Sequence, residues 1–234
     1  GLVLSHTNDK IKFTATTSYQ FMHDRMRMDN DLTPLSYFTL EQEQHEHAIT
    51  EDIVLRSNDL SRRWQWIVGA YGFYKKIDMS APVTILKDGI DNLILGNMPA
   101  MIKNLLQFDR DELVVASNFD LPTYGLALYH ESSVKAGERW RFTAGLRLDY
   151  EASKMNYDNH SAIGYKVGPM RPGMPDMIPM HTVEVPFSGE EKMDYLELLP
   201  KFAVNFTTGA GDLYATVTRG YKAGGFNTQI FSDI

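Results

Sequence analysis

The dominant pattern along the chain is an alternation of apolar and polar positions, which is the period of a β-strand with one apolar face. Trp140–Glu151 shows it most clearly, because every second residue is apolar and the residues between are polar or glycine. The same alternation runs through Ile11–Phe21 and Trp64–Tyr74. Further strands are predicted at His47–Arg56, Thr123–Ser132, Glu197–Phe206 and Leu213–Tyr221, with Leu2–Ser5 as the tail of an earlier strand. The chain is therefore predicted to be all-β, with about seven or eight strands.

The connections between these predicted strands alternate between short and long. The short ones are hairpin-sized and rich in turn residues: Ser57–Ser61, Ser133–Glu138 and Thr207–Asp212. The long ones exceed the ~15 residues beyond which structureless loops are uncommon, and lie at about Met26–Glu46, Asp78–Leu121 and Ser153–Tyr195. Because the long connections are every second one, we predict an antiparallel up-and-down sheet with all of its long loops at one end.

The clearest run also has a length that suits a membrane. Trp140 and Tyr150 are ten residues apart, which is roughly 33 Å of strand at ~3.3 Å per residue. A tilt of ~40° reduces this to about 25 Å, the height of the apolar band on an outer-membrane barrel. The length favours a segment of a transmembrane β-barrel. A soluble antiparallel β-sandwich is the alternative, because it also gives each strand one apolar and one polar face.

Composition excludes several other classes of protein. The 234 residues include no cysteine, which excludes disulfides, thiolate metal sites and cysteine nucleophiles. No apolar run reaches the ~18 residues of a membrane helix, which excludes a helical membrane protein but not a β-barrel. A net charge of −7 without a basic cluster makes nucleic acid a poor partner. Motifs of serine hydrolases, zinc proteases and nucleotide-binding loops are absent, so we expect neither an enzyme nor a cofactor.

Three segments carry side chains that suit a metal ion, and each also has a simpler reading. A Pro- and Gly-rich stretch offers soft ligands for Cu(I), or is an adaptable exposed loop; its candidates are Met170, Met174, Met177, Met180 and His181. His45 and His47 share a strand face and could be neighbours on a metal, or are solvated residues at a loop edge. Asp29–Asp31 could bind a cation or form a solvated turn. We predict no metal site from these segments.

Apolar residues recur at helical spacing inside the second long loop, from Ile90 to Leu105. Asn97 and Pro99 indicate that one helix ends and another begins between them, with the asparagine as a cap and the proline in the first turn. The apolar stripe is expected to pack on the base of its own loop or on neighbouring loops, with a ligand-lining role as the alternative.

Four segments, taken in order, resemble the β-barrel of TonB-dependent outer-membrane receptors. Residues 213–227 read LYATVTRGYKAGGFN and are similar to the family's run LYAsvsrGYKaGGFN. Residues 49–57, ITEDIVLRS, resemble its TQElRLaS strand, and residues 64–71, WQWIVGAY, its W-x-W-x-x-G-x-Y strand. Residues 124–150 resemble its hairpin, although Gly125 and Leu128 replace the commoner Ala and Phe, and Asp52 stands where the family usually has Glu.

The resemblance implies that residues 1–234 are an internal part of a barrel of about 22 strands. The plug domain, the segment that contacts TonB and the C-terminal strands are expected to lie outside the chain, because both ends look cut. Such a receptor lies in the outer membrane of a Gram-negative bacterium, in contact with its lipid. It imports a ferric siderophore or a similar scarce nutrient with energy from TonB, which acts through the plug. A passive outer-membrane channel or adhesin barrel is the competing function.

Two groups of residues are candidates for ligand binding. Tyr221, Lys222, Phe226 and Asn227 are expected where the last predicted strand leaves the membrane, and aromatic groups with a lysine suit an anionic ferric chelate. Their alternative is an aromatic girdle with a glycine-rich strand exit. Arg147 and Asp149 lie on the polar face of one strand with Arg141 and Glu151. These four either contact the plug or the solute, or form a charge ladder with the neighbouring strands.

Overall fold

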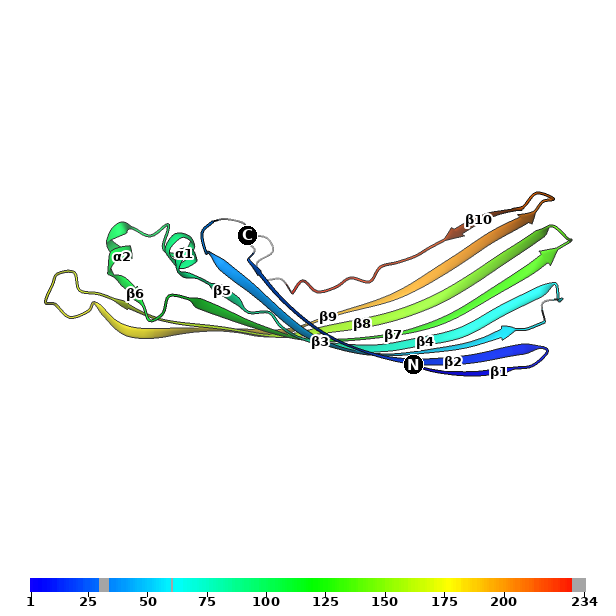
Figure 1. Cartoon of the computed structure of the whole chain (residues 1–234), viewed down its shortest axis with the longest axis horizontal. Coiled ribbons are helices and arrows are strands. Elements are labelled where there is room, and N and C mark those ends of the chain that lie inside the picture. Colours follow the sequence, from blue (N-terminus) through cyan, green and yellow to red (C-terminus); the bar gives the residue numbers. More distant parts are fainter. Residues whose placement is uncertain (30–33, 60, 229–234) are drawn as a thin grey trace.

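A computed structural model describes residues 1–29, 34–59 and 61–228, and in this part of the chain the strands form one continuous antiparallel sheet. Figure 1 shows that the sheet is curved along its length, with a concave and a convex face. Its long strands are β1 (Leu2–Thr7), β2 (Ile11–Asp29), β3 (Phe38–Ser57), β4 (Trp64–Ser80), β7 (Leu113–Ala136), β8 (Trp140–Val167), β9 (Ile178–Thr207) and β10 (Asp212–Thr218). Two short strands, β5 (Val83–Ile85) and β6 (Leu106–Phe108), extend one end of it.

The strand order confirms the predicted up-and-down topology. Each long strand pairs with the next long strand along the chain, and all of these pairs are antiparallel. Every predicted strand is present, and the tail at Leu2–Ser5 is confirmed as part of β1. The last strand ends early, because β10 stops at Thr218 rather than at the predicted Tyr221.

Two of the three predicted long loops are wrong, because most of their residues are strand. The segment 26–46 contains the end of β2 and the start of β3, which pair as far as Asp29↔Thr39. The segment 153–195 contains the end of β8 and the start of β9, which pair as far as Val167↔Ile178. The backbone ladder continues, but polar and apolar residues are mixed on both faces there, so the alternation that marks a strand in the sequence disappears.

The third long connection, 78–121, is the one that carries helices (Figure 1). They are α1 (Lys87–Gly89), the π-helix η1 (Ile90–Ile94) and α2 (Ala100–Leu105). The predicted break near Asn97 is confirmed, but the cap is wrong: Pro99 holds the N-cap position of α2, with no side-chain capping bond. Ile90 and Leu95 are buried, so part of the apolar stripe does pack inside this segment. Among the described residues, no helix is long and apolar enough to cross a membrane.

The convex face carries an apolar band between two rows of aromatic residues. The turn-side aromatic row consists of Trp64, Trp140, Phe142 and Phe206, and the distal aromatic row of Tyr19, Tyr74, Tyr124 and Tyr150. On β4 and on β8 the two rows are ten residues apart, from Trp64 to Tyr74 and from Trp140 to Tyr150. Between the rows lie, among others, Ile53, Val68, Leu126, Leu128, Leu146, Leu148, Leu196, Leu198 and Phe202.

The structure contradicts a β-sandwich. In a sandwich, the apolar side chains of β8 would be sealed between two sheets. Instead, Trp140, Phe142, Leu146 and Leu148 are 44%, 41%, 49% and 42% exposed, and the described residues form a single layer. The fold is therefore a segment of an up-and-down barrel wall, with its apolar band on the convex face.

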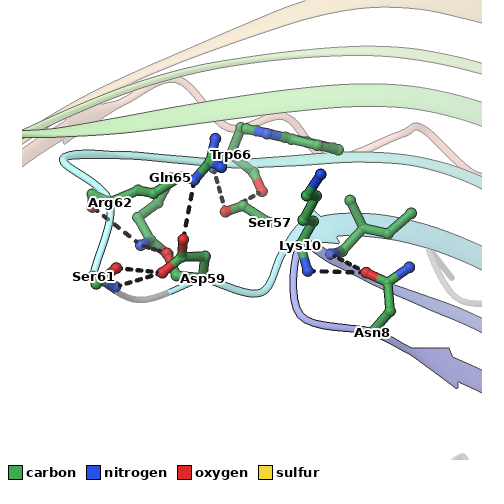
Figure 2. Close-up of polar contacts among 9 residues, drawn as sticks. Asn8, Lys10, Ser57, Asp59, Ser61, Arg62, Gln65 and Trp66 are labelled. Atoms are coloured by element: carbon green, nitrogen blue, oxygen red, sulfur yellow. Dashed lines mark hydrogen bonds and ion pairs between the residues drawn. The ribbon is translucent and has the colours of Figure 1, made fainter.

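The tight turns are ordered by side chains that take over backbone hydrogen bonds (Figure 2). In the β1–β2 turn, the Asn8 side chain accepts from the backbone N–H groups of Lys10 and Ile11, both at 2.9 Å. In the β3–β4 connection, Asp59 accepts from the Ser61 hydroxyl and from Arg62. These bonds, first that from Ser61, lower the pKa of Asp59. Both turns thus close with local polar chemistry, as such residues do in Asx turns.

Candidate functional site

Arg147 and Asp149 lie together on the concave face of β8. The Arg147 Nε donates to Asp149 Oδ1 at 2.6 Å, and Asp149 is almost fully buried. The Arg147 guanidinium also lies over two rings, 5.9 Å from the centroid of Tyr71 on β4 and 5.6 Å from that of Tyr129 on β7. A carboxylate and two aromatic faces thus hold the guanidinium at the concave surface.

Tyr129 extends the same network to β3. Its hydroxyl donates to Asp52 Oδ1 at 3.1 Å, although β4 lies between β7 and β3. The ring crosses β4 directly over Gly69, the register partner of Tyr129. A Cβ at Gly69 would overlap the end of the Tyr129 ring, so the glycine is what allows the ring to pass. Asp52, Tyr129, Arg147 and Asp149 thus form one network over β3, β4, β7 and β8.

A second side-chain contact also crosses a strand over a glycine, and it begins at Glu131, two residues after Tyr129 on β7. Lys201 on β9 donates to Glu131 on β7 at 2.7 Å, across the strand β8 between them. Gly145 is the register partner of both residues, so no side chain separates the lysine from the glutamate. We call these two crossings, with the Arg147–Asp149 pair, the concave polar network.

The charges of β8 and β9 are paired along the same face. Asp149 and Glu197 are opposite each other in register, an arrangement that is repulsive for two bare carboxylates. Each has an arginine: Arg147 for Asp149, and Arg219 for Glu197 at 2.6 Å. The Arg147–Asp149 pair thus lies within β8, and Glu197 of β9 is paired with a residue beyond β10. Whether Arg147 and Asp149 also contact a plug or a solute stays a prediction.

The other four candidates lie beyond β10, in a segment without regular structure that runs over the concave face (Figure 1). Tyr221 is half-buried and interacts electrostatically with Asp149 and Glu151. Phe226 lies elsewhere, against an apolar cluster built on Ala81, Phe119 and Met155. Lys222 and Asn227 are exposed. The structure therefore brings Tyr221 to the concave polar network and places Phe226 at a separate cluster, rather than grouping all four at the exit of a strand.

Sequence reasoning missed Asp52, Gly69, Tyr71 and Tyr129 as members of this site. Each of these residues lies on the concave face of a strand that was predicted correctly. The register between strands was the missing information, since it alone shows that the Tyr129 ring is opposite a glycine.

The concave face is also hollowed near the turns. One cavity of about 260 Å³ is lined by Arg56, Gln65, Ile67 and Glu131 among others. A second of about 250 Å³ lies beside it, next to Glu131, Arg147 and Lys201. Both recesses mix charged side chains of the concave polar network or its neighbours with apolar ones such as Ile67 and Leu199.

The convex face changes beyond the distal aromatic row, where charged residues replace the apolar band. The first convex row past the tyrosines includes His47, Lys76, Lys154 and Lys192; the next includes His23, His45, Asp78, Asp120, Asn156 and Glu190. We call these two rows the polar belt. Ion pairs join them: Lys76 contacts Asp78 at 3.0 Å, and both Lys154 and Lys192 contact Glu190 at 2.5 Å.

The possible metal ligands are arranged differently from the sequence hypotheses. His45 lies with His23 and Glu43, whereas His47 bonds the Tyr19 hydroxyl through Nδ1 at 2.7 Å. The hydrogen bond with His23 lowers the pKa of Glu43 below its ordinary value. The methionines are exposed at and near the β8–β9 connection, where the His181 ring meets Tyr165 edge-on. Of the Asp29–Asp31 candidate, residues 30 and 31 lie outside the described residues.

One comparison with known proteins identifies a family, and a second finds the same fold. The family model described as TonB dependent receptor-like, beta-barrel matches residues 1–233. A solved structure, the ferric yersiniabactin uptake receptor FyuA from Yersinia pestis, is similar with a TM-score of 0.65 and 15% sequence identity. The match covers 96% of this chain and 28% of that one, so the chain spans just over a quarter of its structural neighbour. A search of curated proteins gives no match. On the match of the family model over nearly its whole length, the chain belongs to the TonB-dependent receptor β-barrel family.

Proposed function

We propose that this chain forms part of the barrel wall of an outer-membrane receptor that imports a ferric siderophore, or a similar scarce nutrient, with energy from TonB. Receptors of this family are outer-membrane proteins of Gram-negative bacteria and act in transport rather than catalysis. The structural neighbour is by its title a receptor for uptake of ferric yersiniabactin. The finer statements, namely the ligand class, the energy source and the lipid contact, are ours.

The observation that carries the proposal is the division of one sheet into an apolar band and a charged concave face. Aromatic rows ten residues apart on β4 and on β8 fit the roughly 25 Å height of an outer-membrane apolar band at a tilt of ~40°. In water, an exposed apolar surface of this extent would promote association between protein molecules. Lipid is the solvent that the convex face suits.

The concave polar network suits a barrel wall whose inner face contacts a plug domain or a polar solute. Arg147 and Lys201 of the network, and Arg219 beside it, are each paired with a carboxylate, so the face presents paired rather than bare charges at these positions. In this proposal, the plug contacts the network and its recesses, and Arg147 and Asp149 hold the wall in shape. Tyr221, Lys222, Phe226 and Asn227 are the candidates for contact with the incoming solute.

The test is uptake of radiolabelled iron by whole cells under iron limitation. A strain that lacks the gene is compared with the same strain complemented by the full-length receptor, each with and without TonB, using siderophores that the organism itself secretes. We expect the complemented strain to take up more iron, and only when TonB is present. Equal uptake in the deletion strain would contradict an iron role. Uptake that persists without TonB would instead favour a passive channel.

A further inference from the structure

A cross-strand cluster of two histidines and a glutamate lies in the polar belt of the convex face. His23 is on β2 and faces His45 on β3 in register, with Glu43 two residues from His45 on the same face. The Glu43 Oε1 is 3.1 Å from His23 Nε2 and 3.5 Å from His45 Nε2. The two imidazole rings are stacked, with centroids 4.2 Å apart and planes 13° apart.

These separations match those of ligands around one small metal ion. Two ligand atoms at ~2.1 Å from a tetrahedral zinc ion are about 3.4 Å from each other. Both histidine-to-glutamate distances are within a few tenths of an ångström of this value. All three ligand atoms lie within 4.8 Å of one another, so a small rotation of one imidazole about its soft terminal torsion completes the set.

The charged residues nearest to Glu43 form their own ion pairs with groups outside the cluster. Arg25 is its register partner, but the Arg25 side chain is 3.6 Å from Glu41, which also holds Arg27 at 3.3 Å. On the other side, Asp78 is opposite His45 in register and is held by Lys76. Arg25 also acts electrostatically on Glu43, but the ion pairs of Arg25 and Asp78 are with Glu41 and Lys76, outside the cluster.

The cluster is also accessible and held by rigid backbone. The side chains of His23, Glu43 and His45 are 47%, 42% and 45% exposed, so an ion from solution reaches them and keeps free coordination positions. β2 and β3 pair without a shift of register from one end to the other, which fixes the Cα positions of all three residues. Ligands fixed by the backbone lose little freedom when an ion binds.

We infer that His23, Glu43 and His45 form a binding site for a divalent transition-metal ion of the zinc class, which joins β2 to β3. Two imidazole nitrogens with one carboxylate oxygen are a donor set that suits Zn²⁺ and its neighbours better than Mg²⁺ or Ca²⁺, which prefer oxygen ligands alone. The inference rests on residues of this chain only and is independent of the transported ligand.

The test is titration of Zn²⁺ alone into the full-length receptor, purified without a histidine tag and followed by calorimetry. We expect saturable binding of one ion at this site. His23→Ala and His45→Ala should each weaken it by at least the roughly tenfold that even loss of an outer-shell partner costs. The matched control is His130→Ala, because His130 lies on the same face but on β7, where its ring is hydrogen-bonded to Ser132. Its binding should equal that of the wild type.

Two further variants keep the test decisive. Glu43→Gln removes the carboxylate while keeping its shape, so it should weaken binding even if a histidine variant folds poorly. His181→Ala tests the methionine-bearing connection as a rival site. Absence of saturable binding to the wild type would overturn the inference. Binding that survives His23→Ala, His45→Ala and Glu43→Gln, or that is lost in His181→Ala instead, would overturn it too.

Discussion

The convex face of β8 changes its chemistry partway along the strand, while its backbone pairing stays the same. From Trp140 to Tyr150 the convex positions are apolar or aromatic, and from Lys154 to Asn156 they are polar and bonded to charged neighbours. The strand pairs with both of its neighbours throughout this length. Backbone hydrogen bonding therefore continues along the whole strand. In our proposal, the change in side chains follows the change of solvent from lipid to water.

The largest expected effect comes from a charge placed in the apolar band. Leu146→Arg puts a guanidinium near the middle of the band, and we expect a loss of about 2–4 kcal/mol in free energy of unfolding, the cost of an arginine at the midplane of a bilayer. Urea unfolding of the full-length receptor in lipid vesicles measures it. Asn156→Arg is the matched control on the same strand and face. Because it lies between Asp120 and Glu190, it should cost nothing measurable; equal losses at both positions would contradict the comparison.

A smaller effect is expected where the concave polar network crosses β4. Gly69→Ala forces the Tyr129 ring aside and breaks its bond to Asp52, so we expect a loss of about 1–3 kcal/mol, typical of overpacking. Tyr129→Phe keeps the ring and loses only the hydrogen bond, at about 1 kcal/mol. In a Tyr129→Ser background, Gly69→Ala should cost little. A full cost in that background would show that the glycine serves another purpose.

The crossing over β8 should contribute less. Lys201 and Glu131 are more than a third exposed, so their ion pair is worth no more than ~1 kcal/mol. We expect Glu131→Gln to lower the free energy of unfolding by that amount at low salt and by less at high salt. Gly145→Val places a branched side chain between the two partners and should remove the same salt dependence. Salt dependence that is unchanged in Glu131→Gln would exclude a role for this pair.

The smallest expected effect is a pH dependence in the polar belt. The contacts with Lys154 and Lys192 lower the pKa of Glu190 below its ordinary value of 4.5. The stabilisation is thus complete above the ordinary value and is lost as the pH falls through the lower, folded-state pKa. Glu190→Gln should be slightly less stable than the wild type at pH 7, with the difference vanishing in acid. A difference that persists in acid would mean that charge is not its cause.

The sequence was most informative where the two faces of a strand differ. Trp140–Glu151 could be assigned to a strand, and its convex face identified, because one face carries apolar side chains and the other carries polar side chains or glycine. Beyond Ser153 polar and apolar residues no longer alternate regularly, so a paired strand looked like a loop. The concave polar network was only half predicted: Arg147 and Asp149 were found by their charge. Tyr129 was missed because its role depends on which residue of β4 is opposite, and register is a property of two segments.

The polar belt illustrates the same limit for the metal hypothesis. His45 and His47 stood out because they are two residues apart, a local feature. The partner that the structure gives to His45 is His23, twenty-two residues away in the sequence and directly opposite on β2. Chemistry that depends on cross-strand neighbours is visible only once the pairing is known.

The central claim is that one continuous strand passes from lipid into water, and a spin-label scan along β8 tests it most directly. These 234 residues contain no cysteine. Once any cysteine elsewhere in the full-length receptor is replaced by serine, single cysteines at the convex positions from Phe142 to Asp158 can each be labelled in lipid. We predict labels at 142, 144, 146 and 148 that are accessible to oxygen and shielded from a water-soluble nickel complex, and the reverse at 154, 156 and 158. Labels at 142–148 that are shielded from both reagents, or open to nickel, would contradict the account.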